Sequence, residues 1–596
     1  MLGGITAGIV ALPLALAFGV SSGLGPSAGL YGAIIVGFFA ALFGGTNTQI
    51  SGPTAPMTAV SMVVVTGIIA SFGGELDKAL PIILTVFLLA GIIQIALGAM
   101  GIGKYIRYIP YPVVSGFMTA IGVIIIITQL LPSLGYYPKE DMAFVNQFKP
   151  QAEEIILDQI LKEEAGEGVL VLENFKTTID KAKLITPEQI LKESKTLAGK
   201  ESSGVLGSLK VLPNAWNNLV WIEIILAIIT IITIYGFEKI TRKIPGQLVA
   251  LFVITGIAYG FNLNYRSIEA IPGGIPVPNL GIFTNFDLTS VTPYIFMALT
   301  LALLGAIDSL LTSIVADNMT KTRHRPNKEL IGQGIGNSIA AFFGGLPGAG
   351  ATIRTVVNIR SGGKTRLSGM IASILLLIIL LVLSPIASKI PAAVLAGILI
   401  TVGIGVMDYK GLKAIPNMPR SEVTILIIVL ILSSIWNLVF AVGIGLVLAS
   451  FIFMKKIGDL SIQNSEVKSL DKLVLWNDEK NFPEELSEKI FIKHINGPLF
   501  FGSSSEFHQL AKQIPETASS IIFRMDKMPY IDQSGLYTLE DIVMDFEKEK
   551  KNIYLVGLNK QPAYMFERID IIPDLIPEEH VFSDFDGCLE YIKKQY

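Results

Sequence analysis

The feature that most constrains this chain is a pair of interrupted hydrophobic segments about 300 residues apart. Residues 40–45 read AALFGG and precede the polar, Gly- and Pro-broken run QISGPTAPMT at residues 49–58. Residues 340–345 read AAFFGG and precede the similar run LPGAGATIR at residues 346–354. In membrane proteins, a broken hydrophobic segment at the matching position of each half is the best sequence indication of a transport site.

The composition indicates a helical membrane protein. Hydrophobic residues make up 51% of the 596 residues and charged residues only 16%, whereas soluble domains average about 25% charged residues. The apolar runs approach the roughly 20 residues that a helix needs to cross the hydrocarbon core. The single cysteine, Cys588, excludes an internal disulfide framework and a multi-cysteine metal site, and the four scattered histidines argue against a histidine cluster. No P-loop or nucleophile–base pattern is present, so we expect neither an enzyme nor a nucleic-acid-binding protein.

Hydropathy predicts an all-α polytopic membrane protein with fourteen transmembrane segments, seven in each half. The first seven are Leu2–Val20, Leu30–Phe43, Pro53–Ser71, Pro81–Met100, Val113–Leu131, Val220–Phe237 and Gln247–Phe261. The second seven are Thr292–Val315, Leu330–Phe343, Thr352–Ile359, Leu367–Ser384, Pro391–Met407, Val423–Trp436 and Val439–Met454. The third and tenth segments contain the breaks. Because seven is odd, two repeats of seven in one chain must be inverted relative to each other.

Positive charge predicts the sidedness of this arrangement. Six loops rich in lysine and arginine fall on one side of the membrane if the fourteen segments are right. They contain Lys104 and Arg107; Lys239, Arg242 and Lys243; Lys321, Arg323, Arg325 and Lys328; Arg360, Lys364 and Arg366; Lys410, Lys413 and Arg420; and Lys455 and Lys456. The positive-inside rule makes that side cytoplasmic. We therefore expect a multi-pass protein of the cell (inner) membrane with a cytoplasmic C-terminal region.

Two stretches lie outside the membrane in this interpretation. Residues 135–218 form an outward-facing insertion with helices at Gln151–Glu164 and Pro187–Ala198, and serve either as a solvated cap or spacer or as a binding surface. The transmembrane domain occupies residues 1–456, and residues 457–596 form a linker and a soluble domain. An α/β fold is predicted there by strands at Lys489–Ile495, Ser519–Met525 and Asn552–Val556 and helices at Ser505–Ile514, Ser534–Phe546 and Gln561–Ile569.

Asp308 is the main charged residue at the centre of a predicted span. An aspartate there costs about 2.5–3.5 kcal/mol on insertion scales, so it should face a cavity or a partner. Thr312 lies on the same helical face, and a carboxylate beside a hydroxyl offers hard oxygen ligands for an alkali cation. The alternative is that Asp308 only pairs with Arg354. Arg354 itself either shapes an anion site electrostatically or has a structural role.

The broken segments supply further candidate ligands. Prolines and glycines before Thr352 leave the backbone unwound, which frees the carbonyls of Gly350 and Ala351, together with the Thr352 hydroxyl, for a cation. The two half-helix N-termini each offer free N–H groups and about half a positive charge, and two such ends at one pocket would bind a small anion. That pocket would be lined by Thr54, Thr58, Ala351, Thr352 and Ile353. The alternative is a pair of ordinary helix breaks in a packed bundle.

Taken together, these features resemble the SulP family of anion transporters and exchangers, which includes the sulfate permeases. The resemblance covers almost the whole chain and ends in a cytoplasmic STAS domain, in which Asp532-Gln533-Ser534-Gly535 opens a helix. It implies a homodimer, with the STAS domain associated with dimerisation and regulation. Ser534 corresponds to a serine that is phosphorylated in the related anti-sigma antagonists, and is the candidate regulatory residue. The alternative for Ser534 is a plain helix cap.

Within that family, residues 345–352 (GLPGAGAT) and 11–19 (ALPLALAFG) are most similar to the sodium-dependent bicarbonate transporters of cyanobacterial type. This resemblance implies a Na⁺ site formed by Asp308, Thr312, Gly350, Ala351 and Thr352. It implies an anion site between the third and tenth segments, formed by Thr54, Ala55, Pro56, Met57 and Thr58 with Ala351, Thr352, Ile353 and Arg354. Many sulfate permeases carry a glutamine after the first-span proline, and Leu14 at that position favours bicarbonate over sulfate.

The expected activity is inward Na⁺-coupled bicarbonate symport by an elevator-like mechanism, with a small inorganic anion and membrane lipid as partners. Segments 1–4 and 8–11 would form the moving core domain, and segments 5–7 and 12–14 the gate domain. One alternative is proton-coupled transport of sulfate or a dicarboxylate, with Asp308 taking the proton. A second is an uncoupled anion channel or exchanger, or a membrane sensor that signals through the STAS domain.

Overall fold

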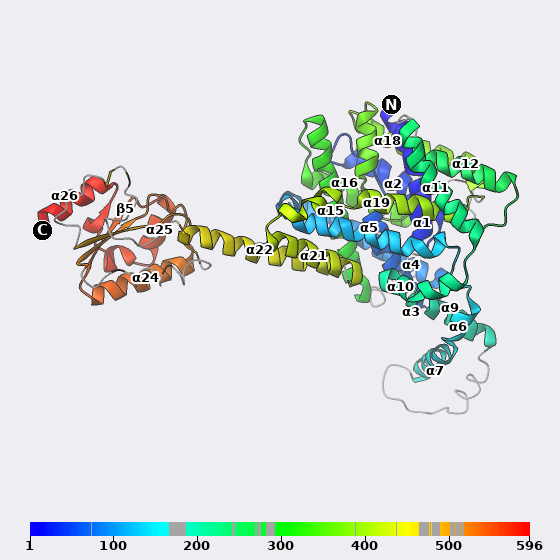
Figure 1. Cartoon of the computed structure of the whole chain (residues 1–596), viewed down its shortest axis with the longest axis horizontal. Coiled ribbons are helices and arrows are strands. Elements are labelled where there is room, and N and C mark those ends of the chain that lie inside the picture. The colour runs from blue at the N-terminus through cyan, green and yellow to red at the C-terminus, as the bar shows by residue number, and fades with distance from the viewer. Residues whose placement is uncertain are drawn as a thin grey trace. The chain divides into compact units, whose positions relative to one another are not determined.

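The computed structural model of the chain divides into two compact units, Met1–Leu446 and Val447–Tyr596 (Figure 1). The first unit is built from helices, and the second contains a four-stranded sheet. The structure describes residues 1–72, 74–165, 186–240, 245–268, 271, 274, 276–279, 281, 292–387, 389–436, 438–463, 476, 478–479, 489–500, 507, 514 and 518–595.

A helix coincides with each of the fourteen apolar segments that hydropathy predicts. In the first half these are α1 (Leu2–Ser22), α2 (Pro26–Phe43), α3 (Ala55–Ser71), α4 (Leu76–Ala99), α5 (Tyr111–Ser133), α11 (Trp221–Ile240) and α12 (Gly246–Gly260). In the second half they are α15 (Ile295–Thr320), α16 (Pro326–Phe342), α17 (Thr352–Arg360), α18 (Leu367–Ala387), α19 (Ala392–Val406), α21 (Arg420–Ile435) and α22 (Leu438–Gln463). Shorter helical turns lie at Ile102–Tyr108, Thr292–Tyr294, Tyr409–Ala414 (α20) and Ile415–Asn417.

Length and apolar composition give a smaller number of spans. Among the described residues, six helices are long and apolar enough to cross a membrane alone. A seventh results if α19 and the helix Tyr409–Asn417, bent by 44°, are counted together. The helices α3, α11, α12 and α18 are apolar but shorter. The fourteen helices are therefore found, while fourteen membrane crossings stay a prediction.

Local sequence signals determine where several helices begin and end. The C-cap of α1 is Gly23, whose φ of 85° is the left-handed conformation that glycine adopts without strain. Both α2 and α16 begin with a proline, Pro26 and Pro326, at a position where the missing N–H is not needed for the helix. The resulting turns are short, and α1 packs directly on α2, as α15 does on α16.

The helices of the two halves pack in reciprocal pairs. α2 packs against α18 as α16 packs against α4, and α1 packs against α18 as α15 packs against α4. α11 packs on α19 as α21 packs on α5. Glycines permit the close approach, since a Cβ at Gly334 in α16 would lie 2.5 Å from the Gly91 carbonyl oxygen in α4. Each contact between two helices thus recurs between the corresponding helices of the other half. This is the packing expected when the two halves are copies of one repeated unit.

Four further helices form the described part of the insertion: α6 (Met142–Asn146), α7 (Lys149–Ala165), α9 (Pro187–Glu201) and α10 (Gly204–Asn217). Two of them, α7 and α9, match the helices predicted from the sequence. Thr186 begins α9 with a capping box shared with Gln189. α9 packs against α3, and α10 packs against α5. The insertion therefore has its own helices and lies on the helical unit, while its outward orientation stays a prediction.

The C-terminal unit contains a parallel sheet with the strand order β3-β4-β5-β6. The strands are Ile490–His494, Ser520–Arg524, Asn552–Val556 and Val581–Phe582. Its helices are α24 (Gln533–Lys548), α25 (Lys560–Arg568) and α26 (Phe585–Gln595), with short helical turns at Ile571–Leu575 and Glu578–His580. The three strands and two of the three helices agree with the predicted positions within a few residues. The predicted helix Ser505–Ile514 lies mostly outside the described residues.

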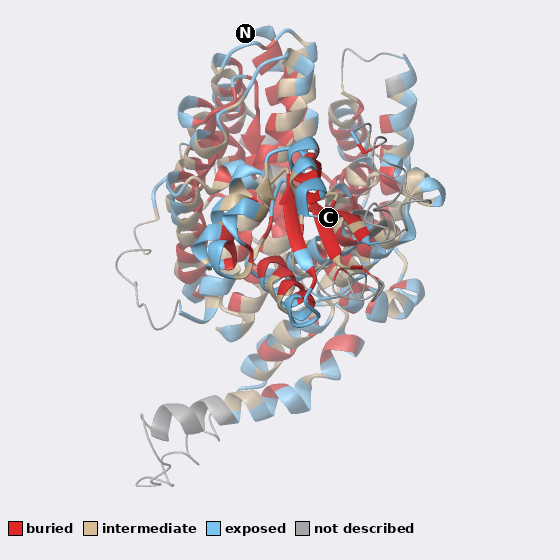
Figure 2. Cartoon of the chain, turned by 90° about the vertical axis from the view of Figure 1, so that its left-hand side faces the viewer, coloured by how far each residue is buried: buried red, intermediate tan, exposed pale blue. Residues whose placement is uncertain are grey.

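Both faces of this sheet are covered, as is usual for parallel strands. Phe523 and Leu555 belong to an apolar cluster on one face, and Ile522 and Tyr554 to a cluster on the other. All residues of β4 and most residues of β3 and β5 are buried, and strands coloured as buried are visible in Figure 2. Cys588, in α26, belongs to the second cluster.

The burial of Cys588 predicts an unreactive thiol. Its side chain is 0% exposed, and burial raises the pKa of the thiol to about 12. We expect a maleimide to label the native full-length protein at least ~100-fold more slowly than an exposed thiol at neutral pH, because little thiolate forms. Mass spectrometry measures the labelling, and SDS-denatured protein, which should label fully, is the control. Rapid labelling of the native protein would show that α26 does not stay on the sheet.

Candidate functional site

The two breaks found in the sequence lie side by side in the structure. β1 (Ser51–Gly52) precedes α3, β2 (Ala349–Gly350) precedes α17, and the two short strands pair in antiparallel orientation. The N–H of Ala351 also donates to the carbonyl of Ile50, at 2.8 Å. The N-termini of the two half-helices are thereby held next to each other.

Only glycine fits where these segments cross. A Cβ on Gly348 would lie 2.2 Å from the carbonyl carbon of Gly52, closer than real Cβ atoms approach other atoms. Gly52 has a φ of 144°, a backbone conformation that residues with a Cβ rarely adopt. The glycines of both breaks are therefore needed for the strands to meet.

Neither half-helix is capped by its own N-cap side chain. The N-cap residues are Thr54 in α3 and Ala351 in α17, and neither makes a side-chain capping hydrogen bond. Ala351 has no polar side chain, and Thr54 directs its hydroxyl to another helix. First-turn N–H groups that are not used by a cap, at the positive end of a helix dipole, form the arrangement that binds anions at helix N-termini.

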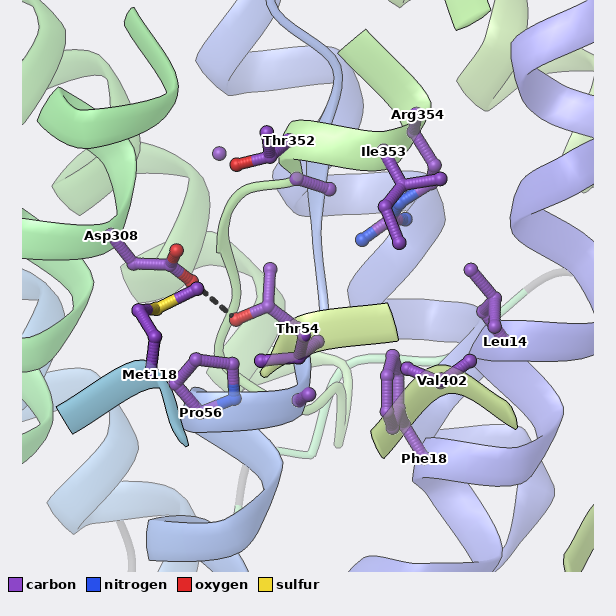
Figure 3. Close-up of a pocket in the computed structure, with 14 residues that line it drawn as sticks. Leu14, Phe18, Thr54, Pro56, Met118, Asp308, Thr352, Ile353, Arg354 and Val402 are labelled. Atoms are coloured by element: carbon purple, nitrogen blue, oxygen red, sulfur yellow. Dashed lines mark hydrogen bonds between the residues drawn. The ribbon is translucent and has the colours of Figure 1, made fainter. Parts of the chain in front are cut away.

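Oxygen atoms from α15 and both breaks converge at these tips. The Thr54 hydroxyl donates to Asp308 Oδ2 at 2.7 Å, as the dashed line in Figure 3 marks. One helical turn after Asp308, the Thr312 hydroxyl donates to the Gly350 carbonyl at 2.8 Å and lies 2.7 Å from the Thr352 hydroxyl. A carboxylate, two hydroxyls and a carbonyl are hard oxygen ligands, which suit an alkali cation.

Arg354 is buried beside the same tips, with 2% of its surface exposed. Its Nη2 donates to the Pro53 carbonyl at 2.5 Å, and its Nε has no hydrogen-bond partner among the described residues. Among the described residues, Asp308 accepts a hydrogen bond from Thr54, and it interacts with Arg354 electrostatically without a direct salt bridge. Asp308 thus has a second partner besides Arg354, and its role as a cation ligand stays a prediction. A buried guanidinium without a contacting carboxylate attracts an anion.

A cavity of about 70 Å³ lies between these polar groups and an apolar wall. This volume has room for a few water molecules or one small oxyanion. The apolar wall is formed by Leu14 and Phe18 of α1, Met118 of α5 and Val402 of α19 (Figure 3). Val406 of α19 also lines the cavity. The cavity can thus hold an anion whose charged oxygens face the helix N-termini, while apolar side chains cover its other side.

Most of the predicted site residues line this cavity. They are Thr54, Ala55, Pro56, Asp308, Gly350, Ala351, Thr352, Ile353 and Arg354. Thr312 lies behind them, in contact with Thr352. Thr58 lines a smaller neighbouring cavity instead, and Met57 packs near Gly305 of α15. The cavity lies at the tip of α3, so residues further along the first turn are rotated away from it.

The sequence analysis did not identify Phe18, Met118, Val402 and Val406. An apolar side chain in an apolar helix gives no signal that distinguishes a cavity wall from a packed or lipid-facing surface. Three buried polar residues of α16, Glu329, Gln333 and Asn337, were not predicted either, although their spacing of four residues is visible in the sequence.

Ser534, the predicted regulatory residue, is exposed in the first turn of α24. The N-cap of this helix is Asp532, whose carboxylate accepts a hydrogen bond from the N–H of Gly535 at 2.8 Å. The capping role considered for Ser534 therefore belongs to Asp532. A regulatory role of Ser534 stays a prediction.

Comparisons with known proteins give one consistent result. A family model described as the sulfate permease family matches residues 1–151 and 179–429, and a STAS domain model matches residues 483–586. The bicarbonate transporter BicA of Synechocystis is 35% identical, over 99% of this chain and 93% of its own length. These matches confirm the resemblance drawn from the sequence motifs.

Solved structures agree. The transmembrane domain of a cyanobacterial bicarbonate transporter, BicA, aligns with a TM-score of 0.57 and 38% identity, over 75% of this chain and 96% of that one. The murine Solute Carrier 26 family member A9 anion transporter, in its inward-facing state, aligns with a TM-score of 0.73 over 100% of this chain and 91% of that one. Its identity is 17%, so it supports the fold alone.

The contact between the breaks predicts an intolerance to side chains at Gly348. In Gly348→Ala, the new methyl group would push β1 and β2 apart, and we expect a loss of about 1–3 kcal/mol of stability. Gly67→Ala in α3 is the matched control, because a Cβ there would meet nothing within 4 Å, and alanine favours the helix by about 0.5–1 kcal/mol. Thermal unfolding of the purified full-length protein measures the stability of both variants. Equal melting temperatures for the two variants would contradict the tight crossing.

Proposed function

The chain belongs to the sulfate permease family, and on that premise we propose that it carries bicarbonate into the cell together with Na⁺. It is a multi-pass membrane anion transporter with a C-terminal STAS domain, and not an enzyme. The choice of bicarbonate, the coupling to Na⁺ and the transport step are the proposal, and they rest on the residues described above.

The small cavity with one buried guanidinium is the observation that carries the choice of bicarbonate. Its volume is about 70 Å³, and Leu14 presents an apolar surface to it. A singly charged oxyanion can be satisfied by the helix tips and Arg354, whereas a doubly charged one needs more donors when it loses its water. BicA, which is 35% identical to this chain, is named as a bicarbonate transporter.

The coupling between cation and anion would act through Asp308. An ionised carboxylate that is bonded to Thr54, at the edge of the cavity, repels an anion. A cation held by the oxygens of Asp308, Thr312 and Thr352 would cancel that repulsion and raise the affinity for bicarbonate. By linkage, bound bicarbonate raises the affinity for Na⁺ by the same factor.

The proposed transport step is elevator-like. The moving core would consist of α1–α4 and α15–α18, and the gate of α5, α11, α12, α19, α21 and α22. The polar side of the cavity belongs to the core, whereas Met118, Val402 and Val406 belong to gate helices. Because these gate residues offer no hydrogen bonds to the anion, the bound ions would stay with the core when it moves.

The proposal also includes the remaining topology. Residues 1–456 would cross the membrane fourteen times as a seven-plus-seven inverted repeat, with the insertion at 135–218 outside. Residues 457–596 would be cytoplasmic, and two chains would form a homodimer.

Proton-coupled sulfate or dicarboxylate transport is the alternative function. Asp308 has a single hydrogen bond among the described residues, and a proton would neutralise its carboxylate as Na⁺ would.

Asp308→Asn tests the cation site, since it removes the charge but keeps an acceptor for Thr54. We expect Na⁺-driven uptake of labelled bicarbonate into proteoliposomes to fall at least ~10-fold. Asp77→Asn is the control, because Asp77 is exposed in the first turn of α4. Bicarbonate uptake without a Na⁺ requirement in the unchanged protein would defeat the proposal, as would normal Na⁺ dependence in Asp308→Asn. Sulfate uptake driven by a pH gradient would select the alternative.

Leu14→Gln tests the basis of anion selectivity, because it adds a hydrogen-bond donor to the apolar wall. A hydrogen bond to a charged group contributes about 1.5–3 kcal/mol. We therefore expect sulfate to compete with labelled bicarbonate at least ~10-fold more strongly in Leu14→Gln than in the unchanged protein. Leu14→Met, which keeps the wall apolar, should retain the original selectivity. Identical competition curves for all three proteins would show that Leu14 does not determine selectivity.

A further inference from the structure

Three buried polar residues form one stripe along α16. Glu329, Gln333 and Asn337 are spaced four residues apart and so lie on one helical face. Their exposed fractions are 1%, 0% and 2%. Burying a carboxylate and two amides is unfavourable unless each is hydrogen-bonded, so the partners of this stripe indicate what it does. None of the three lines the anion cavity.

Glu329 holds the chain that leads into the first break. Its Oε2 accepts hydrogen bonds from the backbone N–H groups of Gly45 and Thr46, both at 2.8 Å. Its Oε1 accepts from Gln49 Nε2 at 2.8 Å and from Gln333 Nε2 at 2.9 Å. All four partners are donors, an arrangement that suits an ionised carboxylate and no neutral side chain of the same size.

The middle of the stripe connects the first break with α15. Gln333 Nε2 donates to the Ser51 hydroxyl of β1 at 2.5 Å. The Gln49 side chain, which is held by Glu329, accepts through Oε1 from the Ser313 hydroxyl at 2.9 Å. Ser313 directly follows Thr312. The segment that leads into the first break therefore contacts α15 directly through Gln49, and Glu329 of α16 holds the Gln49 side chain in that position.

Asn337 holds the second break. Its Oδ1 accepts from the N–H of Gly348 at 2.8 Å, and its Nδ2 donates to the carbonyl of the same residue at 3.0 Å. Nδ2 also donates to Gln94 Oε1 of α4, at 2.9 Å. One side chain thus satisfies both backbone groups of Gly348, two residues before the Gly350 carbonyl that Thr312 contacts. The orientation of the peptide at Gly348 is set by α16.

We propose that Glu329, Gln333 and Asn337 are positioning residues that hold both breaks at the spacing that Na⁺ binding requires. This inference rests on the proposed function and adds the element that sets its geometry. Coordination of a cation requires oxygens placed within a few tenths of an ångström, and residues that touch no ligand supply that accuracy through hydrogen bonds. A helix places such side chains more accurately than a loop does, because its hydrogen-bonded backbone fixes their positions relative to one another.

Asn337→Asp is the sharpest test, because it preserves size and the acceptor for the Gly348 N–H. The second carboxylate oxygen would face the Gly348 carbonyl and Gln94 Oε1, where the donor Nδ2 is required. The contact with the Gly348 carbonyl then becomes repulsive without a cavity being made, whereas Gln94 can turn its amide, because its Nε2 has no hydrogen-bond partner among the described residues. Ser338→Ala is the matched control, since Ser338 is the next residue of α16, is buried, and its hydroxyl has no hydrogen-bond partner among the described residues.

The first measurement is Na⁺ affinity, read from the Na⁺-dependent rise in melting temperature of the purified full-length protein, with choline chloride balancing ionic strength. We expect the half-saturating Na⁺ concentration to rise at least ~10-fold in Asn337→Asp and to be unchanged in Ser338→Ala. In proteoliposomes, the KM for Na⁺ should rise by a similar factor while the maximal bicarbonate uptake rate falls less than ~2-fold. A merely structural role would lower the amount of active protein without changing the KM.

The second measurement is hydrogen–deuterium exchange at residues 348–351, which does not depend on any substrate. Exchange should be faster in Asn337→Asp and unchanged in Ser338→Ala. If the unchanged protein shows no Na⁺ effect, the proposed coupling fails, and the exchange result alone decides whether α16 positions the break. If Asn337→Asp does not fold, Gln94→Met, which removes only the partner on α4, should shift both measurements in the same direction. Normal exchange and normal Na⁺ titration in a folded Asn337→Asp protein would overturn the inference.

Discussion

The rest of the structure depends on holding two helix N-termini next to each other in an apolar surrounding. Both ends carry partial positive charge, so they repel each other, and uncapped N–H groups are costly away from water. The pairing of β1 with β2 opposes this repulsion, and Asp308 supplies a negative charge through its hydrogen bond with Thr54. Each hydrogen bond contributes only about 0.5–1.5 kcal/mol net. The remaining stabilisation of the two N-termini must therefore come from the surrounding helices, above all from α16.

Hydropathy and helix-breaking residues were enough to predict the fourteen apolar helices, although not α6, α10 or the strands β1 and β2. Each of the fourteen predicted segments coincides with a helix, because continuous apolar runs bounded by glycine, proline and charge leave few alternatives. The repeated break predicted that two distant segments belong together, and β1 and β2 do pair. Asp308 stood out because an acid in an apolar helix requires a partner, although the sequence did not indicate that this partner is Thr54.

The parts of the site that escaped prediction depend on how helices pack. Met118 and Val402 look like any other apolar residue in a span, and only the arrangement of α5 and α19 around α1 brings them to the cavity. Thr58 was selected for its hydroxyl, but the rotation of α3 turns it to another cavity. The stripe on α16 did carry a signal, because Glu329, Gln333 and Asn337 recur every four residues. Averaging hydropathy over all residues of a segment hides a polar face, because the apolar residues on the other faces dominate the mean.

Charge balance links the buried acid, the buried base and the proposed choice of a singly charged substrate. Asp308 and Arg354 are both buried and sum to zero charge, so without a cation the site offers an anion little net attraction. Two like charges 4 Å apart repel by about 4 kcal/mol at an effective dielectric constant of 20, so in the proposed coupling a cation would neutralise the carboxylate first. With Na⁺ bound the site would carry one positive charge, and bicarbonate would restore neutrality before the core moves. Sulfate would leave one negative charge buried in the membrane, so it would need an additional cation or proton.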